Sequence, residues 1–336
     1  MHERLGAQAD YAELKRRMVD AGLLAPRPMQ SAVNAAIVLT LFLSAVAVAY
    51  SYPFAALALP AAALLGFASV QVEMVGHDIG HHQIPLGRRW SVLLGLLVGN
   101  VLLGMSYTMW IDKHNRHHAY PNDEGRDPDG NYAVLALTKN QVRTRSRAMR
   151  PLLAYQAFLF PVWLLLQAWV MRFSSVRRLL RRSGSGWELA MLAVNLCWYG
   201  LLLVHLGPWL ALGFVFLHHG VMGLYNGLVF APNHKGMRVA GEPEGETYLF
   251  RQASTARNVR GGALTDFCLG GLNYQIEHHL FPTMPRTRLK SAQALVEASC
   301  TAHGVPYTRV SPLESYAALF QHLHRVSSPL RRSEPR

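Results

Sequence analysis

More than half of the 16 histidines in the sequence fall in four short stretches, GHDIGHHQ, HNRHH, APNHKGM and YQIEHHLFP. Imidazole binds iron, copper, nickel and zinc alike, so these stretches indicate metal chemistry without choosing the metal. The eight candidate ligands are His77, His81, His114, His117, His118, His234, His278 and His279.

The number of these histidines indicates two metal ions. Side chains three and four positions apart share a helix face, so GHDIGHHQ and HNRHH each predict a group of imidazoles that points at one place. Zinc sites in proteins use three or four ligands, and eight imidazoles are therefore enough for two ions. Any single pair is equally compatible with a solvated helix face. Four clusters without a metal would instead leave many buried nitrogens in need of partners.

Ligating imidazoles usually donate their second nitrogen to a carboxylate, a carbonyl or water. Asp78 and Glu277 adjoin the clusters and are candidates for this role. His82 would point about 100° away from His81 on a helix, which leaves it beside the ligands or facing a substrate. Further carboxylates and amides close to the clusters are Asp112, Asn115, Asp123 and Asp127.

The composition indicates a membrane protein. Of the 336 residues, 51% are hydrophobic and only 16% are charged, whereas about 25% of residues are charged in a typical soluble domain. The net charge of +13 comes largely from basic residues between apolar runs, which favours the positive-inside rule over nucleic-acid binding. Three cysteines without a CxxC pair make a disulfide framework unexpected.

Six apolar runs approach the length of about 20 residues that crosses a bilayer. Of these, the last includes His218 and His219, which either line a substrate tunnel or bond a neighbouring helix. The runs span residues 31–51, 53–75, 90–108, 151–171, 187–206 and 208–230.

Charge placement argues for four crossings rather than six. The basic segments RTRSRAMR (143–150) and RRLLRR (177–182) flank the run at 151–171, so both of its ends favour the cytoplasmic side. Basic residues also precede the run at 90–108, and the same reasoning applies to it. We therefore predict an all-α integral membrane protein with four transmembrane helices in two hairpins, interfacial helices, and a cytosolic helical cap that carries a di-metal site.

The chain is predicted to be one membrane domain over residues 1–336. Its expected parts are an N-terminal cytosolic amphipathic helix (1–30), a first hairpin (31–75), a cytosolic or interfacial segment with the first two clusters (76–186), a second hairpin (187–230), a cytosolic cap with the last cluster (231–326) and a tail (327–336). Ser311 and Glu314 form a capping-box pattern, which predicts a helix from Pro312 to about Val326.

The motifs HDIGH, HNRHH and NYQIEHH resemble the three histidine boxes of the integral-membrane fatty acid desaturases, HxxxH, HxxHH and (H/Q)xxHH. APNHKGM also resembles the acyl-lipid and linoleoyl-CoA desaturase-like branch, and the likeness covers roughly residues 30–310. It implies four membrane helices under a cytosolic cap, and the eight histidines as ligands of two irons. Gln275 stands where some relatives have another histidine, so it either holds a water or leaves one iron more open. Asn233 is a candidate for a water-mediated contact.

The resemblance implies an oxidoreductase in the cell (inner) membrane whose site faces the cytoplasm. It would use O2 to remove two hydrogens from an acyl chain carried on a phospholipid, CoA or a carrier protein. The sequence shows no GxGxxG fingerprint and no HPGG-type segment, so we expect electrons from a separate ferredoxin or cytochrome with its reductase. Basic residues that are candidates for docking that donor are Lys113, Arg116, Lys235, Arg286, Arg288 and Lys290, although an ordinary inside-positive surface is the favoured interpretation of any single one.

Other functions are compatible with parts of this pattern. The nearest is a related di-iron hydroxylase, epoxidase, acetylenase or carotenoid oxygenase. A histidine-rich metal transporter or sensor would place polar residues along consecutive spans, but residues 31–72 carry almost none. A haem protein needs two axial histidines and leaves the others unexplained.

Overall fold

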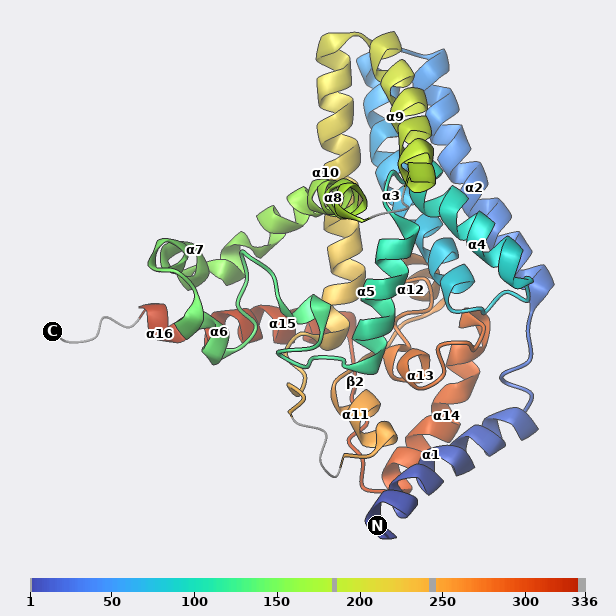
Figure 1. Cartoon of the computed structure of the whole chain (residues 1–336), viewed down its shortest axis with the longest axis vertical. Helices are drawn as coiled ribbons and strands as arrows, with labels where there is room; N and C mark the ends of the chain where they lie inside the picture. Colours follow the sequence, from blue (N-terminus) through green and yellow to red (C-terminus); the bar gives the residue numbers. More distant parts are fainter. Residues whose placement is uncertain (1, 183–185, 242–245, 332–336) are drawn as a thin grey trace, which may run out of the picture. The chain divides into compact units, whose positions relative to one another are not determined.

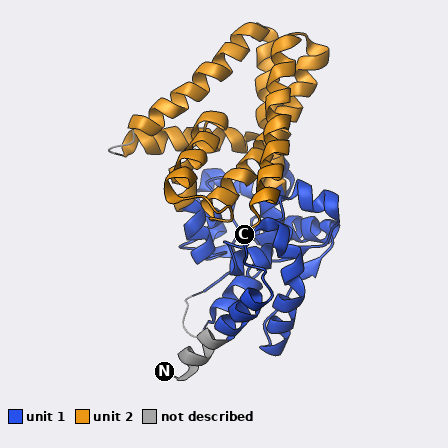
Figure 2. Cartoon of the chain, turned by 90° about the vertical axis from the view of Figure 1, so that its right-hand side faces the viewer, with its two compact units in different colours: residues 1–25, 113–161, 229–336 blue, residues 26–112, 162–228 orange. Residues whose placement is uncertain are grey.

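The computed structural model describes residues 2–182, 186–241 and 246–331, with side chains from residue 10 onward. The described chain is mainly helical, which confirms the predicted all-α class (Figure 1). It divides into two compact units, coloured in Figure 2. Unit 1 comprises residues 1–25, 113–161 and 229–336, and unit 2 comprises residues 26–112 and 162–228.

Five described helices are long and apolar enough to cross a membrane. Four of them coincide with the runs that we predict to form the two hairpins. The fifth, α8, contains most of the run at 151–171, whose first residues form a separate short helix. Length and composition alone do not distinguish α8 from the others, so the count of four crossings stays a prediction. The five are α2 (Pro28–Ser51), α3 (Ala55–Gly80), α8 (Gln156–Arg181), α9 (Gly186–Leu206) and α10 (Pro208–His234).

Two of these helices extend beyond the apolar runs and carry candidate ligands. Helix α3 continues to Gly80, so His77 lies in its last turn and His81 caps its end. Helix α10 continues to His234, which is its last residue. His77 and His234 therefore lie on long helices rather than in loops.

Glycines allow close helix packing in unit 2. A Cβ at Gly66 on α3 would lie 2.6 Å from the carbonyl oxygen of His218 on α10. A Cβ at Gly223 would overlap the carbonyl oxygen of Leu164 on α8. Helix α10 thus packs closely against both α3 and α8, although α8 exposes large apolar side chains such as Phe173 along its other face.

The run predicted at 90–108 is broken. It forms α4 (Arg88–Leu96) and a π-helical segment (Leu97–Leu102), and the chain then bends by 110° into α5 (Tyr107–Ala119). Gly95 and Gly99 lie against Tyr107, whose side chain occupies the space that a Cβ at Gly95 would need. Helix α5, which begins after this bend, contains the second histidine cluster, HNRHH.

Unit 1 has its own apolar core. Leu14 and Met18 of α1 (His2–Asp20) are buried in it, so this amphipathic helix packs against the unit. Helix α15 (Pro312–Val326) begins with the predicted capping box of Ser311 and Glu314. The other helices of the unit are α6 (Lys139–Thr144), α7 (Arg150–Ala154), α11 (Tyr248–Ser254), α12 (Ala263–Cys268), α13 (Gln275–Leu280), α14 (Arg286–Ala302) and α16 (Ser328–Arg331).

The strands of the described chain are two short segments in unit 1. Strand β1 (Asn258–Val259) pairs in parallel with β2 (Arg309–Val310). The backbone of Ile276, at the start of α13, donates to Asn258 Oδ1 over 2.9 Å. This small sheet therefore anchors the helix that carries the last histidine cluster.

Candidate metal centre

Six of the eight candidate ligands lie in unit 1, where they form two sets. The imidazole nitrogens within each set lie within 4.8 Å of one another. We call His117, His234 and His279 set A, and His114, His118 and His278 set B. Helices α5 and α13 contribute to both sets, and α10 contributes His234 to set A.

The helical rotation explains how neighbouring histidines separate. Each residue turns by about 100° around an α-helix, so the adjacent His278 and His279 of α13 point in different directions. On α5, His114 and His118 are four apart and share a face, whereas His117 points into set A. The expectation that HNRHH points at one place is therefore wrong, since this cluster supplies both sets.

The Nε2 atoms of set A converge. His117 Nε2 lies 3.3 Å from His234 Nε2, and His279 Nε2 lies 3.1 Å from the same atom. All three side chains are buried. Burial, followed by the charges of neighbouring histidines such as His118, holds the pKa of His279 well below its ordinary value, which keeps its imidazole neutral.

The opposite nitrogens of set A are all held by protein oxygens. Carboxylate, carbonyl and amide oxygens accept hydrogen bonds only, so each Nδ1 carries the hydrogen and, in a neutral ring, each Nε2 keeps its lone pair. Three lone pairs thus meet at one point, an arrangement that fits a bound cation. The acceptors are Asp127 for His117 (3.0 Å), the Thr255 carbonyl for His234 (3.0 Å) and Gln252 Oε1 for His279 (2.9 Å).

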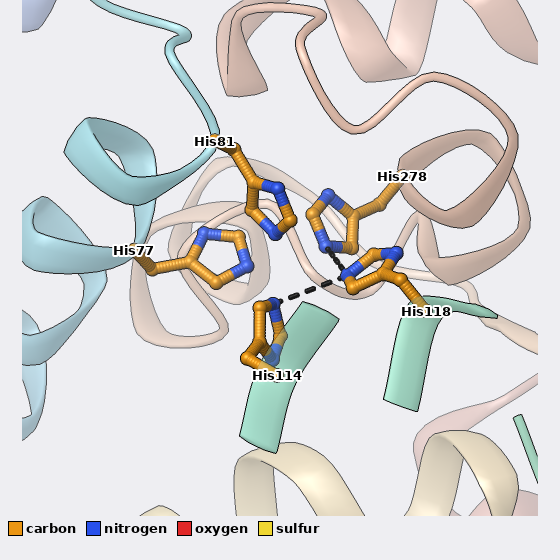
Figure 3. Close-up of side chains that lie close together, drawn as sticks. All are labelled: His77, His81, His114, His118 and His278. Atoms are coloured by element: carbon orange, nitrogen blue, oxygen red, sulfur yellow. Dashed lines mark hydrogen bonds between the residues drawn. The ribbon is translucent and has the colours of Figure 1, made fainter. Parts of the chain in front are cut away.

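Set B shows a similar convergence. His118 Nε2 lies 3.1 Å from both His114 Nε2 and His278 Nε2, as the dashed lines in Figure 3 show. Figure 3 also draws His77 and His81 from unit 2, whose ring centroids are 4.6 Å apart. The two imidazoles therefore lie beside each other at the end of α3, as the i, i+4 spacing predicts.

The carboxylate of Asp127 is the best defined support of a candidate ligand. It is 2% exposed, and it accepts from His117 and from the backbone N–H groups of Asn122 and Asp129. Burial tends to raise its pKa, but the hydrogen bond and charge of His117 and the charge of Lys235 outweigh this and lower it. The group is thus ionised and orients the His117 ring.

Other predicted supports have different partners. Asp112 pairs with Arg178, and Asp123 pairs with Arg126. Asp78 lies 3.6 Å from His77 Nδ1, which is longer than a hydrogen bond. Asn115 is exposed.

Glu277 supports the small sheet rather than an imidazole. Its carboxylate accepts from Asn258 Nδ2 and from the Tyr307 hydroxyl, each over 2.7 Å. Burial raises the pKa of Glu277 to about 7, against the lowering effect of these hydrogen bonds. The side chain faces away from its neighbour His278 because it lies on another side of the short helix α13.

The two predicted amides lie beside set A. Gln275 Nε2 is 3.0 Å from His234 Nε2. The amide nitrogen of Asn233 donates to the carbonyl oxygens of Val229 and Leu272, while its Oδ1 is buried without a hydrogen-bond partner among the described residues. Gln275 therefore offers a polar atom to the converging Nε2 atoms, and Asn233 contacts Gln275 over 3.4 Å.

Three further expectations on single residues change with the structure. His82 lies beyond the end of α3 with a φ of +55° and is exposed, so the helical direction assumed for it is wrong. Lys235 is buried, and its ammonium donates to the Asp129 carbonyl oxygen over 2.8 Å, so it is unavailable for docking a donor. His218 contacts Ser69 and Tyr199 through its two nitrogens, which favours bonding between helices over lining a tunnel.

Gln252 and Thr255 are the functional residues that sequence reasoning missed. Gln252 on α11 accepts from His279, and its amide nitrogen donates to the His118 carbonyl over 3.0 Å. No motif surrounds these residues, and both lie more than 20 positions from the imidazoles that they hold. Only the packing of α11 against α5 and α13 in unit 1 identifies them.

The apolar helices and the converging imidazoles define a multi-pass membrane protein with sites suited to metal. The family model for "Fatty acid desaturase" matches residues 50–311. The Delta(8)-fatty-acid desaturase of Euglena gracilis is 32% identical over 331 residues, covering 94% of this chain and 78% of that protein. The chain therefore belongs to the fatty acid desaturase family.

Two other relatives extend this comparison. The Delta(8)-fatty-acid desaturase of Helianthus annuus is 30% identical and the Delta(5) fatty acid desaturase fat-4 of Caenorhabditis elegans is 34% identical, each over 74% of this chain. The chain spans 58% and 59% of the lengths of these two proteins.

Proposed function

We propose that this chain is a membrane-bound, O2-dependent di-iron desaturase that introduces a carbon–carbon double bond into the acyl chain of a lipid or acyl thioester. The observation that carries the proposal is the convergence of three lone-pair-bearing Nε2 atoms in set A, with every Nδ1 held by an acceptor. Membership of the desaturase family supplies the reaction class.

Two irons account for the eight histidines. We infer that set A holds one ion and that set B supplies ligands to the other, while His77 and His81 stay predicted ligands from the resemblance of HDIGH to a histidine box. Gln275 would then face the ion that has only three imidazoles, which leaves that ion more open to small ligands. Bound iron would supply the activation of O2 and the oxidising power that removal of hydrogen from an unactivated CH2 group requires.

The protein's own residues would position these ions and exclude water. Asp127, Gln252 and the Thr255 carbonyl fix the ring orientations of set A, and burial of the imidazoles keeps bulk water away. A dry and rigid site is what selective oxidation of a hydrocarbon requires, because a reactive oxidant would otherwise attack the protein or be quenched.

The names of the relatives support a proposal for the position of the new double bond. Their names place their reactions at the Delta(5), Delta(6) and Delta(8) positions, which are counted from the carboxyl carbon. We therefore propose that this enzyme also acts on the carboxyl side of the acyl chain, with electrons from a separate ferredoxin or cytochrome.

Expression of the chain in a host that lacks desaturases tests the reaction. We expect new monounsaturated or more unsaturated acyl chains, with double bonds located chemically near the carboxyl end. The matched control is the same chain with His117→Ala. A hydroxylated product without a new double bond would instead indicate the related hydroxylase, and an unchanged lipid profile with metal uptake would indicate a transporter.

The contact between His117 and His234 supports four crossings. Their Nε2 atoms are 3.3 Å apart within unit 1, and the chain between them runs through α8, α9 and α10. A chain that leaves one side of a bilayer and returns to the same place crosses an even number of times. If α9 and α10 both cross, α8 therefore does not, and its basic ends can both stay in the cytoplasm.

A topology reporter fused after Arg182 tests this arrangement. We expect a cytoplasmic signal there and at the C-terminus, because α8 lies along the membrane surface in the proposed topology. A reporter fused after Leu206, between α9 and α10, is the matched control and should report the opposite side. A signal from the opposite side at Arg182 would contradict the four crossings.

A further inference from the structure

Side chains of helix α9 hydrogen-bond to the backbone at the bend before α5. Asn195 Nδ2 on α9 donates to the carbonyl oxygens of Val101 (2.8 Å) and Leu102 (3.1 Å), at the end of the π-helical segment. Trp198 Nε1 donates to the Val101 carbonyl over 2.9 Å. A helix end that cannot continue its own hydrogen bonds is thus satisfied by side chains of a neighbouring helix.

One carboxylate joins both sides of the bend. Glu188, in the first turn of α9, is 3% exposed. Its Oε2 accepts from Asn100 Nδ2 (3.2 Å) in the π-helical segment and from Ser106 Oγ (2.9 Å) just before α5. Its Oε1 accepts from Thr108 Oγ1 (2.7 Å) in the first turn of α5.

The partners of Glu188 also bind the start of α5 directly. Asn100 Oδ1 accepts from the backbone N–H of Tyr107 over 3.1 Å, and Ser106 Oγ accepts from the backbone N–H of Met109 over 3.2 Å. These two N–H groups have no partner within their own helix because they lie in its first turn. The carboxylate is thus the hub of a closed network that fixes where α5 begins and in which direction it runs.

Burying the Glu188 carboxylate costs desolvation free energy, which a bend held by apolar packing alone would avoid. A buried carboxylate must be fully hydrogen-bonded to be tolerated, and apolar packing can hold two helices at an angle without one. Gly104 has a φ of +67° and lies against Asn195, so the turn itself is already shaped by backbone and packing. The carboxylate of Glu188 therefore adds a constraint on the start of α5 beyond this packing.

We propose that Glu188 is a positioning residue for the metal centre. By holding Thr108 in the first turn of α5, it fixes the directions of three histidines that lie six to ten residues after Thr108 on the same helix. These are His114, His117 and His118. This inference rests on the proposed function. Loss of the carboxylate lets α5 tilt, and a tilt at its first turn is enlarged at the imidazoles.

Iron retention by the purified full-length chain tests the proposal. With Glu188→Ala we expect iron to pass to a ferrous chelator about tenfold faster or more, the size of effect typical of groups that orient metal ligands. Glu188→Gln keeps one accepting oxygen and should recover part of the retention. Tyr199→Phe removes a buried hydrogen bond from the same helix without touching the bend, and should behave as wild type.

A second variant keeps the test valid if Glu188→Ala does not fold. Thr108→Val is isosteric and removes one hydrogen bond to Glu188, so it should speed iron loss by a smaller factor. Helix content and membrane insertion are measured for every variant. Wild-type retention of iron in both Glu188→Gln and Thr108→Val would overturn the proposal.

A readout without iron separates this inference from the proposed function. Spin labels at Asn115→Cys on α5 and Leu201→Cys on α9, with the three native cysteines replaced by serine, report the distance between the helices. Glu188→Ala should broaden or shift the distance distribution whether or not the wild-type chain binds iron. A wild-type chain without iron would reject only the proposed function. An unchanged distribution would overturn the positioning role.

Discussion

Replacement of His117 by alanine is expected to reduce desaturation to background while leaving the chain in the membrane. His117 is one of only three imidazoles in set A, and it is buried beside His234 and Asp127. A site with three protein ligands loses much of its affinity when one is removed, and the Asp127 carboxylate would be left without its partner. Product formation in isolated membranes and iron content of the purified protein measure the effect.

The control for this variant is His324→Ala. His324 lies on the exposed side of α15 and belongs to neither set. We expect close to two irons per chain in the wild type and in this control, and fewer than two in His117→Ala. Full activity of His117→Ala would exclude His117 as a ligand, and wild-type iron content in an inactive variant would give it a role other than binding.

Replacement of Asp127 by asparagine is expected to weaken iron binding by about 10- to 100-fold, the range found when a group that orients a ligating histidine is removed. The amide has the same size as the carboxylate but no charge. It can no longer stabilise the hydrogen on His117 Nδ1 in the same way, and the backbone N–H groups of Asn122 and Asp129 would compete for its one oxygen. Iron affinity, measured by competition with a chelator, checks the expectation.

Asp112→Asn is the matched control for Asp127. Asp112 lies five residues before His117 but pairs with Arg178 at an exposed position, where an ion pair contributes little. Its replacement should leave iron affinity and activity within about twofold of wild type. Equal effects of the two substitutions would mean that charge in this region, rather than orientation of His117, controls the metal.

The local pattern of the sequence determined much of the fold. Apolar runs of membrane length predicted α2, α3, α9 and α10 because a helix that faces lipid must be apolar over its whole length. The Ser311 and Glu314 pair predicted the start of α15 because a capping box is satisfied within four residues. The spacing of the histidines identified the candidate ligands, and the motifs HDIGH, HNRHH and NYQIEHH indicated the desaturase family.

Only the tertiary structure decided which groups meet. It divided HNRHH between two sets, brought Gln252 and Thr255 to the imidazoles, and turned Glu277 toward Tyr307. These contacts join residues that are far apart in the chain and depend on the angles at which helices pack. A side chain's type and its neighbours in sequence report what it can bind, but its direction in space is set by helices that the local sequence does not contain.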